Sequence, residues 1–259
     1  MALAAAASYR MVIAYDGTRY HGWQAQSQVA TVQGELSRAL AEVTGERPAI
    51  KAAGRTDAGA HAHGQVISFS LQSAQAPGAL KGGCNAHLPE DIGVLETTLV
   101  GSEFHPRWQA WRRTYRYLIR DEATLDPVGR QYEWRIRRAV ELAPVRAAAR
   151  LLLGTHDFGG FGSSPFSAGS TTRTVDRADI TRQDGVVILE VRADAFLRGM
   201  MRNFAGALLA VGTGRASTAD LAKALAEPAG VTPIWEPAPA HGLHQWQVEY
   251  RASAAEVQA

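Results

Sequence analysis

The sequence predicts an α+β protein made of two halves, and the order of its elements is the main reason. In the first half, segments with the periodicity of strands and helices follow one another as strand, helix, strand, strand, helix, strand, the order of a ferredoxin-like unit. The second half contains similar parts, although the two halves share no convincing sequence identity. The length of 259 residues and the 46% content of apolar residues suffice for one large domain or two smaller ones.

The first half opens with a strand and an amphipathic helix. Residues 9–15 are rich in β-branched and aromatic side chains and end at the turn pair Asp16-Gly17, which predicts a strand followed by a turn. Apolar residues recur on one side of residues 31–43, with Thr31 available as the N-cap, which predicts a helix. The other predicted elements of this half are strands at 49–53, 63–71 and 92–100 and a helix at 78–87.

The second half is predicted to contain a hairpin and one long helix. Residues 174–181 and 186–194 flank the turn Gln183-Asp184-Gly185 and form the predicted hairpin. Residues 197–211 carry an apolar face of Leu, Met, Phe and Val and form the long helix. The other predicted elements of this half are strands at 113–120, 131–137 and 245–250 and helices at 143–153 and 218–226.

The predicted boundary lies near residues 103–106, which gives an N-terminal half of residues 1–105 and a C-terminal half of residues 106–259. No stretch of about 20 apolar residues is present, so no membrane span is expected. The apolar stretch at residues 3–7 is too short for the core of a signal peptide. A single cysteine, Cys84, excludes an intrachain disulfide and a cysteine-based zinc site, so the expected location is cytoplasmic.

The net charge is only +2, but the arginines are unevenly distributed. Residues 104–138, the basic tract, contain nine arginines and four acidic residues, whereas the rest of the chain has a net charge of −3. Guanidinium groups bind phosphates and aromatic rings stack on bases, so this combination suits RNA. The alternative is a basic pair of strands whose aromatic side chains are buried in a core. The aromatic residues of the tract after Phe104 are Trp108, Trp111, Tyr115, Tyr117, Tyr132 and Trp134.

The densest group of potentially reactive residues is AGRTDAGAHAHGQ, residues 53–65. Three glycines surround an Arg-Thr-Asp triplet, so this loop can turn sharply and bring the Asp57 carboxylate close to a ligand. An aspartate beside Arg55 should stay ionised near neutral pH, as a nucleophile or a base must. In one alternative Asp57 only binds local amides in a turn. In another, His61 and His63 bind a metal, because a His-x-His pair on a strand points both rings the same way.

The same segment, extended to AGRTDAGAHAHGQVISF, closely resembles the active-site signature of the tRNA pseudouridine synthase A (TruA) family. Further strings match that family in order, and the similarity covers residues 9–250. These strings are YDGTRYHGWQAQ, TVQGELSRAL, NAHLPEDI, FHPRWQAWRRTYRYLI, LLGTHDF, TTRTV, AFLRGMMRNFAGALLAVG and APAHGL. Any one of them would be weak, but their shared order makes coincidence an inadequate explanation.

The resemblance implies an isomerase that converts uridine to pseudouridine at positions 38, 39 and 40 of the tRNA anticodon stem-loop. Asp57 matches the family's catalytic aspartate, and Tyr115 matches the tyrosine that packs on the target base. Arg202 matches the arginine that pairs with the catalytic carboxylate, and Arg55 matches a basic residue near the flipped nucleotide. The family works as a homodimer with tRNA spanning both subunits, so tRNA and a second copy of the chain are the expected partners.

For the fold, the resemblance favours two ferredoxin-like (RRM-like) halves whose antiparallel sheets join, with a central active-site cleft that holds Asp57. Two positions depart from the family's usual pattern. Ala60 stands where valine is commoner. His244 and Gln245 stand where the family tends to have an aromatic residue or cysteine followed by an apolar residue, which leaves this wall of the pocket undefined.

The chemistry of the reaction needs no cofactor. Isomerisation breaks the N1–C1′ glycosidic bond, rotates the uracil and rejoins it through C5, with no net oxidation, and the sequence contains neither a GxGxxG motif nor a P-loop. Asp57 can act as a nucleophile or as a base toward C2′ of the ribose, and the sequence leaves both open. A base in a stem must first be flipped out at a cost of about a few kcal/mol, which stacking on Tyr115 would partly offset.

The arginines predicted to contact RNA lie on a strand, before it and in the long helix. Tyr115 and Tyr117 should share one face of their strand, with Arg116 on the other. Arg198 and Arg202 are four residues apart in the predicted helix, so both could reach a cleft. The predicted phosphate-binding residues are Arg107, Arg112, Arg113, Arg116 and Arg198.

Two other classes of protein compete with the synthase. An RRM-like RNA-binding module without catalysis would use the basic aromatic strands but would not need Asp57 and Arg202. A metal-dependent hydrolase would be distinguished by the metal content of the purified protein.

Overall fold

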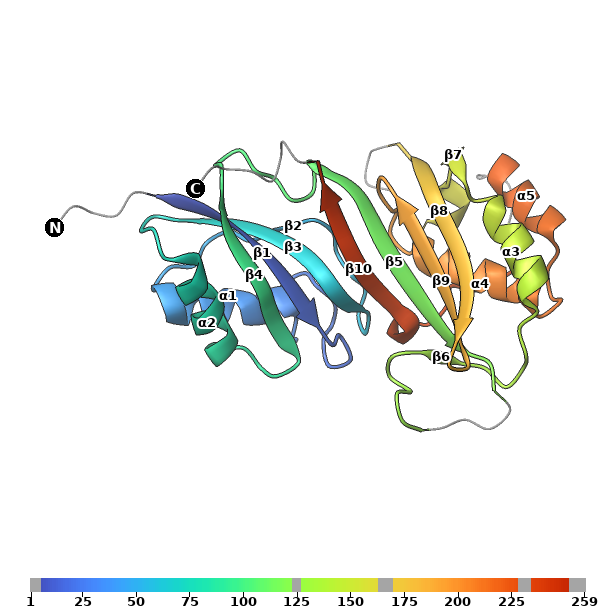
Figure 1. Ribbon diagram of the computed structural model, residues 1–259, viewed down its shortest axis with the longest axis horizontal. Helices are drawn as coiled ribbons and strands as arrows, with labels where there is room; N and C mark the ends of the chain where they lie inside the picture. The colour runs from blue at the N-terminus through green and yellow to red at the C-terminus, as the bar shows by residue number, and fades with distance from the viewer. Residues whose placement is uncertain (1–5, 123–126, 163–169, 228–233, 252–259) are drawn as a thin grey trace. The chain divides into compact units, whose positions relative to one another are not determined.

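The computed structural model describes residues 6–122, 127–162, 170–227 and 234–251 (Figure 1). Within these residues the chain is a mixed α+β protein with five α-helices and strands that pair mostly antiparallel. It divides into two compact units: unit 1 contains residues 1–111 and 245–259, and unit 2 contains residues 112–244. Most of the apolar stretch at residues 3–7 lies outside the described residues.

Unit 1 is built on a sheet in which β1 is flanked by β4 and β3. Both pairings are antiparallel, and Tyr9 of β1 lies opposite Phe69 on one side and Leu99 on the other. On its far side β3 pairs with β10 and with the short β2. The strands are β1 (Ala7–Tyr15), β2 (Lys51–Ala52), β3 (His61–Leu71), β4 (Ile92–Val100) and β10 (Leu243–Tyr250).

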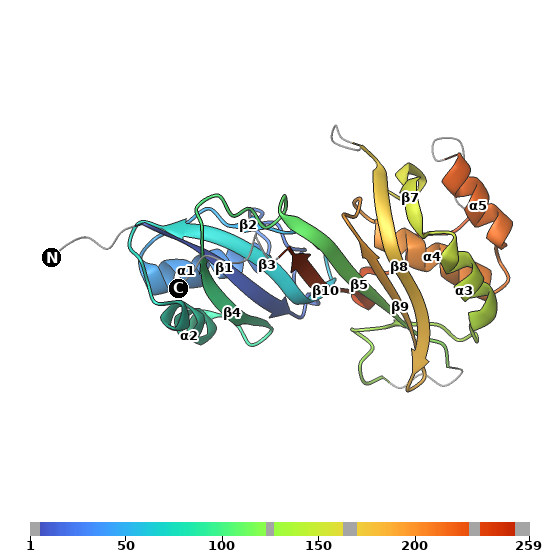
Figure 2. The ribbon, with the colours of Figure 1, turned by 45° about the horizontal axis from the view of Figure 1, so that its top comes forward.

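Helices α1 (Val32–Thr44) and α2 (Pro77–His87) pack on one face of this sheet (Figure 2). Thr31 caps α1 as predicted, because its hydroxyl accepts a hydrogen bond from the Gly34 amide at 3.3 Å. Gly45 ends the helix with a φ of 72°, a conformation that glycine adopts without strain. The main core of unit 1 therefore lies between the two helices and the strands, and includes Tyr9, Met11, Ile13, Leu36, Leu40, Ile67 and Leu80.

A second, smaller apolar cluster lies in unit 1 apart from this core. It consists of Ala53, Val66, Val100, Phe104 and Val248, with Val12, Ala110 and Tyr250 packed against it. Since side chains alternate along a strand, Val12 and Val66 point away from the face on which Met11 and Ile67 meet the helices. Phe104 and Ala110 come from the chain that follows β4, so this segment covers the second face.

Unit 2 is built on strands that pair in the order β5, β9, β8, β7. The predicted hairpin is confirmed as β8 and β9, whose turn places Asp184 at a φ of 49° and Gly185 at 76°. The short edge strand β7 was not predicted, and its sequence GTHD has few β-forming residues. The strands are β5 (Ala110–Arg120), β6 (Trp134–Arg135), β7 (Gly154–Asp157), β8 (Thr172–Gln183) and β9 (Val186–Ala193).

The strand predicted at residues 131–137 is wrong for most of its length. Only β6 is a strand there, and it pairs parallel with β5. Gly129, with a φ of 78°, forms a turn in which its carbonyl accepts from the Tyr132 amide, so the backbone before β6 is not extended.

The helices of unit 2 are α3 (Leu142–Arg150), α4 (Met200–Gly212) and α5 (Thr218–Ala226), with short 3₁₀ turns η1 (Gly159–Phe161) and η2 (Ala240–Gly242). Helix α4 was expected to have one apolar face, but it is buried on all sides, with Arg202 as the exception. It also starts later than predicted, because Gly199 precedes it with a φ of 74°. None of the helices in the described ranges is long and apolar enough to cross a membrane.

Candidate active site

The Asp57 loop, residues 53–60, joins β2 to β3 in unit 1. Within it Arg55 is exposed, Thr56 is buried and Asp57 is half-buried. The Thr56 carbonyl accepts from the Trp23 amide at 3.2 Å, and the Thr56 hydroxyl lies 2.8 Å from the Tyr15 hydroxyl. The residue beside Asp57 is therefore fixed on both its backbone and its side chain, which holds the loop in one conformation.

The loop at residues 16–23 supports the Asp57 loop through unusually close backbone contacts. A Cβ atom at Gly17 would lie 1.9 Å from the Ala60 carbonyl oxygen, so no other residue fits there without a shift of the backbone. Gly22 has a φ of 87°, and its Cβ would lie 2.9 Å from the Thr56 carbonyl oxygen. The glycines in YDGTRYHGW thus allow the two loops to touch.

This supporting loop is itself tied to the start of β4. The Tyr20 hydroxyl donates to Asp91, which also accepts from Arg19 at 2.7 Å, and the Tyr20 carbonyl accepts from the Gly59 amide at 3.3 Å. Burial of Tyr20, and then its hydrogen bond to Asp91, raise the pKa of the phenol. Tyr20 therefore stays neutral and donates to Asp91. Because the Tyr20 carbonyl binds the Gly59 amide, this also fixes Gly59, two residues after Asp57.

Gln245, one of the departures from the family pattern, also reaches this loop. It is fully buried and donates to the Gln65 amide oxygen at 3.1 Å, and Gln65 donates to the Gly54 carbonyl at 2.9 Å. The amide of Gln245 thus supports the Asp57 loop through Gln65. The other departure, His244, belongs to unit 2, where its Nε2 lies 2.8 Å from the Tyr132 carbonyl oxygen.

His61 and His63 are used separately rather than as a pair of metal ligands. His61 is buried, and its Nδ1 lies 3.1 Å from both the Gly17 amide and the Asp16 carboxylate. His63 is exposed, and its ring packs on Trp246 at a centroid distance of 4.4 Å. Among the residues that the structure describes, no three His, Cys, Asp or Glu side chains are grouped so that they could hold a metal ion. The two histidines therefore have different neighbours.

Arg202 lies in the first turn of α4 in unit 2 and is held by the segment before η2. Its Nε donates to the Ala238 carbonyl at 2.6 Å, while the Ala238 amide donates to the Arg202 carbonyl at 3.0 Å. A Cβ at Gly206 would lie 2.0 Å from the Glu236 carbonyl oxygen, so this glycine lets the segment approach the helix. The strings MMRN and APAHGL, far apart in the sequence, are therefore neighbours in the fold.

Tyr115 and Tyr117 share a face of β5, as predicted, and both are buried. Tyr115 meets the edge of the Phe196 ring at 4.7 Å, whereas the Tyr117 hydroxyl donates to the Pro239 carbonyl at 2.6 Å. Burial raises the pKa of Tyr117, and the positive charge of Arg202 opposes this shift. Tyr117 is thus a neutral structural donor near Arg202.

Three of the five predicted phosphate-binding arginines already have partners within unit 2. The Nε of Arg112 donates to Asp176 at 2.5 Å, and the Nε of Arg116 donates to Glu190 at 2.7 Å. Arg113 is buried and donates to the Asp194 carbonyl. The other two, Arg107 and Arg198, are exposed. Because α4 begins at Met200, Arg198 lies in the turn before it, and the predicted helical spacing to Arg202 is wrong.

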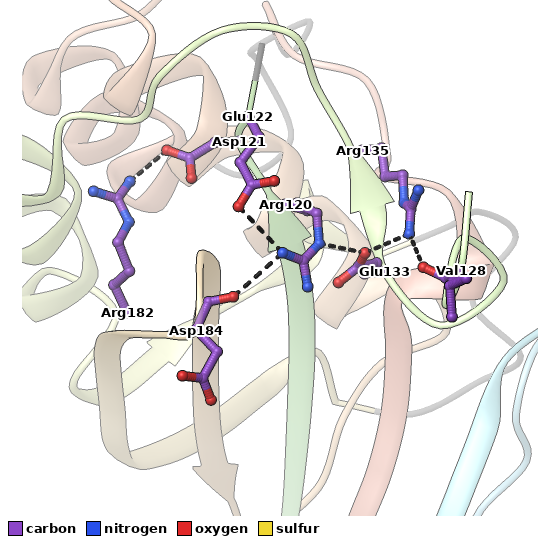
Figure 3. A network of polar contacts seen from close by, with 8 residues as sticks. All are labelled: Arg120, Asp121, Glu122, Val128, Glu133, Arg135, Arg182 and Asp184. Atoms are coloured by element: carbon purple, nitrogen blue, oxygen red, sulfur yellow. Dashed lines mark hydrogen bonds and ion pairs between the residues drawn. The ribbon is translucent and has the colours of Figure 1, made fainter. Parts of the chain in front are cut away.

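The end of the basic tract forms a polar network of its own (Figure 3). Arg120 and Arg135 both donate to Glu133, at 2.6 and 2.8 Å, and Arg135 also donates to the Val128 carbonyl. Nearby, Arg182 pairs with Asp121. Two arginines that were predicted as part of a cationic tract, Arg120 and Arg135, therefore bind Glu133 next to β6.

Sequence reasoning missed the residues that hold the site in place. Tyr15, Asp91 and Gln245 support the Asp57 loop, and Ala238 supports Arg202 through its backbone. Tyr15, Asp91 and Ala238 were included only as parts of the family strings, and Gln245 only as a departure from the family pattern. A hydrogen bond to a distant group leaves no pattern in the sequence.

Comparison with known proteins identifies the family. The model of the tRNA pseudouridine synthase family matches residues 11–109 and 148–251. Three relatives, each named tRNA pseudouridine synthase A, match most of the chain. The protein from Neisseria meningitidis serogroup C is 40% identical over 85% of this chain and 83% of its own. That from Methylacidiphilum infernorum is 38% identical over 95% and 96%, respectively, and that from Citrifermentans bemidjiense 38% over 83% and 86%.

The chain therefore belongs to the tRNA pseudouridine synthase family, a family of isomerases. The resemblance read from the motifs is confirmed. A solved Cbf5–Nop10–Gar1 complex also matches, at 10% identity and a TM-score of 0.34, over 78% of this chain and 54% of the matched chain, which is too weak to support any argument.

Proposed function

We propose that the chain converts uridine to pseudouridine at positions 38, 39 and 40 of the tRNA anticodon stem-loop, with Asp57 as the reacting carboxylate. The single observation that supports this most is the position of the RTD motif. In a chain 38–40% identical to proteins named tRNA pseudouridine synthase A, Asp57 is half-buried in a loop whose neighbouring residue is fixed at two points. A carboxylate in such a loop is pre-positioned for reaction.

Arg202, Tyr115 and Arg55 complete the proposed site. Arg202 pairs with the Asp57 carboxylate and orients it, since a guanidinium binds a carboxylate in a fixed geometry. Tyr115 packs on the target base once that base has been flipped out of the stem. Arg55, which is exposed beside Asp57, binds the backbone of the flipped nucleotide.

The reaction balances without an external reagent. The N1–C1′ bond breaks, the uracil turns, and a C5–C1′ bond forms, while C5 loses a proton and N1 gains one. Asp57 serves either by adding to the sugar or by removing a proton from C2′, and both routes need the ionised carboxylate. No oxidant, reductant or nucleotide is consumed.

We also propose the architecture and assembly that the resemblance implies. Residues 1–105 and 106–259 form two ferredoxin-like halves whose sheets join around a central cleft, and two copies of the chain bind one tRNA in the cytoplasm. The order β4, β1, β3 within unit 1, with the short β2 also paired to β3, supports the ferredoxin-like assignment for the first half.

The replacement Asp57→Asn tests the proposal. It preserves the size of the side chain and removes the charge, so pseudouridine formation in tRNA should fall below detection while tRNA binding changes by less than about tenfold. Mapping of pseudouridine in treated tRNA and a filter-binding assay measure the two quantities. Retained turnover in the Asp57→Asn protein would contradict the assignment of Asp57, and modification only at other uridines would contradict the assigned positions.

A further inference from the structure

Trp108 is the most exposed aromatic side chain among the described residues, at 71%. The chain around it is anchored to the second apolar cluster of unit 1 by Phe104 and Ala110. In addition, the Pro106 carbonyl accepts a hydrogen bond from the Tyr250 hydroxyl at 2.8 Å. The segment thus packs against the second apolar cluster, yet the Trp108 side chain stays exposed to solvent. Exposed aromatic surface of this kind is typical of interaction sites.

The turn that carries Trp108 is rigid. The Nδ1 atom of His105 accepts from the amides of Arg107 and Trp108 at 3.2 and 3.4 Å, and the Gln109 side chain accepts from the His105 amide at 2.9 Å. Burial, and then the charges of Lys51 and Arg107, lower the pKa of His105, which keeps Nδ1 available as an acceptor. The backbone that carries the Trp108 ring is therefore held in place before any partner arrives, which reduces the entropy lost on binding.

Cationic groups accompany the exposed rings. The Arg107 guanidinium lies over the Trp108 ring at 4.8 Å, and the Arg251 guanidinium lies over the Trp111 ring at 5.5 Å. Trp111 is itself 40% exposed and three residues further along the chain. We call these four residues the Trp108 platform. Aromatic rings beside guanidinium groups bind stacked bases and the adjacent phosphates together.

A hollow of about 220 Å³ lies where this segment meets the sheet, with Phe104 and Lys51 in its wall. Hydroxyl and ammonium groups donate hydrogen bonds to phosphate and ribose oxygens. The hollow offers such donors beside Phe104, because its wall also includes Ser68, Ser102 and the mutually bonded Ser8 and Ser70.

We propose that the Trp108 platform is a second RNA-binding site of unit 1, which stacks an unpaired base of the tRNA substrate and binds its neighbouring phosphates. This inference rests on the proposed function only in naming tRNA as the RNA. Charge complementarity favours RNA over a protein or a second copy, because a guanidinium group, that of Arg107 or Arg251, lies over each ring. Ala53 of the Asp57 loop packs in the same cluster as Phe104, so the loop and the platform share one support.

Trp108→Ala should weaken tRNA binding by about tenfold at fixed salt, in line with the cost of losing one base–aromatic stack, with a matching rise in KM. Its log–log salt slope should stay near the wild-type value, since no charge is removed. Trp108→Phe keeps a stacking surface and should stay within about threefold of the wild type. Leu99→Ala is the matched control, because Leu99 is also an exposed apolar residue of unit 1, at 47%, and it should bind like the wild type.

Unchanged affinity in Trp108→Ala would overturn the inference, as would an equal loss in Leu99→Ala. A change in the sedimentation of the free protein without a change in tRNA affinity would also overturn it and would assign the ring to a contact between copies. Pseudouridine mapping with the wild-type protein separates this test from the proposed function. If the wild-type protein modifies tRNA and Trp108→Ala binds tRNA as tightly as the wild type, only the inference about the platform is refuted. If Trp108→Ala binds tRNA more weakly but the wild-type protein forms no pseudouridine, only the proposed reaction is refuted.

Discussion

At the scale of single residues, Arg202 has two interactions within unit 2 that the sequence did not predict. Its Nε is already bound to the Ala238 carbonyl, and its charge acts on Tyr117. A guanidinium has further N–H groups in a fixed fork, so one edge can hold the fold while another faces a carboxylate. This is why the arginine is not equivalent to a lysine at this position.

Arg202→Met should therefore lower the rate of pseudouridine formation by several orders of magnitude, because the proposed pair with Asp57 is lost. The free energy of unfolding should fall by only about 1 kcal/mol, the usual value of one hydrogen bond. Single-turnover kinetics and urea unfolding measure the two effects. Arg150→Met, at an exposed arginine of α3, is the control and should change neither quantity. Wild-type rates in Arg202→Met would show that the pair does not form.

The residues of the candidate site could be named from the sequence only through the motif. Composition alone left Asp57 as either a reactive carboxylate or a turn residue, and it gave His61 and His63 the same direction. In the fold the two histidines differ in burial and neighbours, and the pairing of β1 and β3 shifts register between Ile13 and Tyr15, close to His61. A single irregularity of this kind is invisible in a pattern with a period of two.

At the scale of elements, strands β5, β8 and β9 are joined by ion pairs across unit 2. Asp176 of β8 accepts from Arg112 of β5 at 2.5 Å and from Arg192 of β9 at 2.8 Å. Burial alone would raise the pKa of Asp176, but the hydrogen bonds from Arg192 and Arg112 outweigh it and lower the pKa. Arg112 thus contributes to the stability of the sheet whether or not it meets RNA.

Asp176→Asn should destabilise unit 2 near neutral pH, because Arg112 and Arg192 then face each other without the carboxylate. A carboxyl whose pKa is lower in the folded state stabilises the fold above its unfolded pKa of about 3.9 and loses this effect as the pH falls through the folded value. The difference between the variant and the wild type should therefore shrink below about pH 3.9. Urea unfolding at several pH values measures it. Asp179→Asn, in an ion pair whose two side chains are about half exposed, is the control. A difference independent of pH would contradict the assigned role.

The elements themselves could largely be predicted, and the errors have physical causes. Helices α1 and α5 and the hairpin β8–β9 were found because periodicity, an N-cap and a turn all agree at those places. The strand around β6 was overestimated because Trp, Tyr and Ile favour strands wherever they occur, whereas a turn at Gly129 and ion pairs at Glu133 decide the local backbone. The burial of helix α4 on nearly all sides could not be predicted from its own sequence, since it depends on segments that are distant in the chain.

At the scale of the whole molecule, the net charge is close to zero, but the arginines differ in what they bind. Much of the basic tract is paired within the fold, through Arg112, Arg116, Arg120 and Arg135. An arginine whose partner is a carboxylate must give up or share that partner to bind a phosphate, which reduces the net gain. The exposed Arg198 therefore has more to gain from RNA than these paired arginines.

The salt dependence of tRNA binding tests this division. The logarithm of the affinity should fall linearly with the logarithm of the salt concentration for the wild type, because bound phosphates release counterions. Arg198→Ala should make this slope shallower by about 0.7 to 0.9, the value for one lost phosphate contact. Arg116→Ala should leave the slope nearly unchanged and instead lower the stability of unit 2, since Glu190 then loses one of its two arginine partners and keeps Arg177. If Arg116→Ala flattens the slope and Arg198→Ala does not, the ion pairs of β5 open when tRNA binds, and the basic tract is the phosphate-binding surface after all.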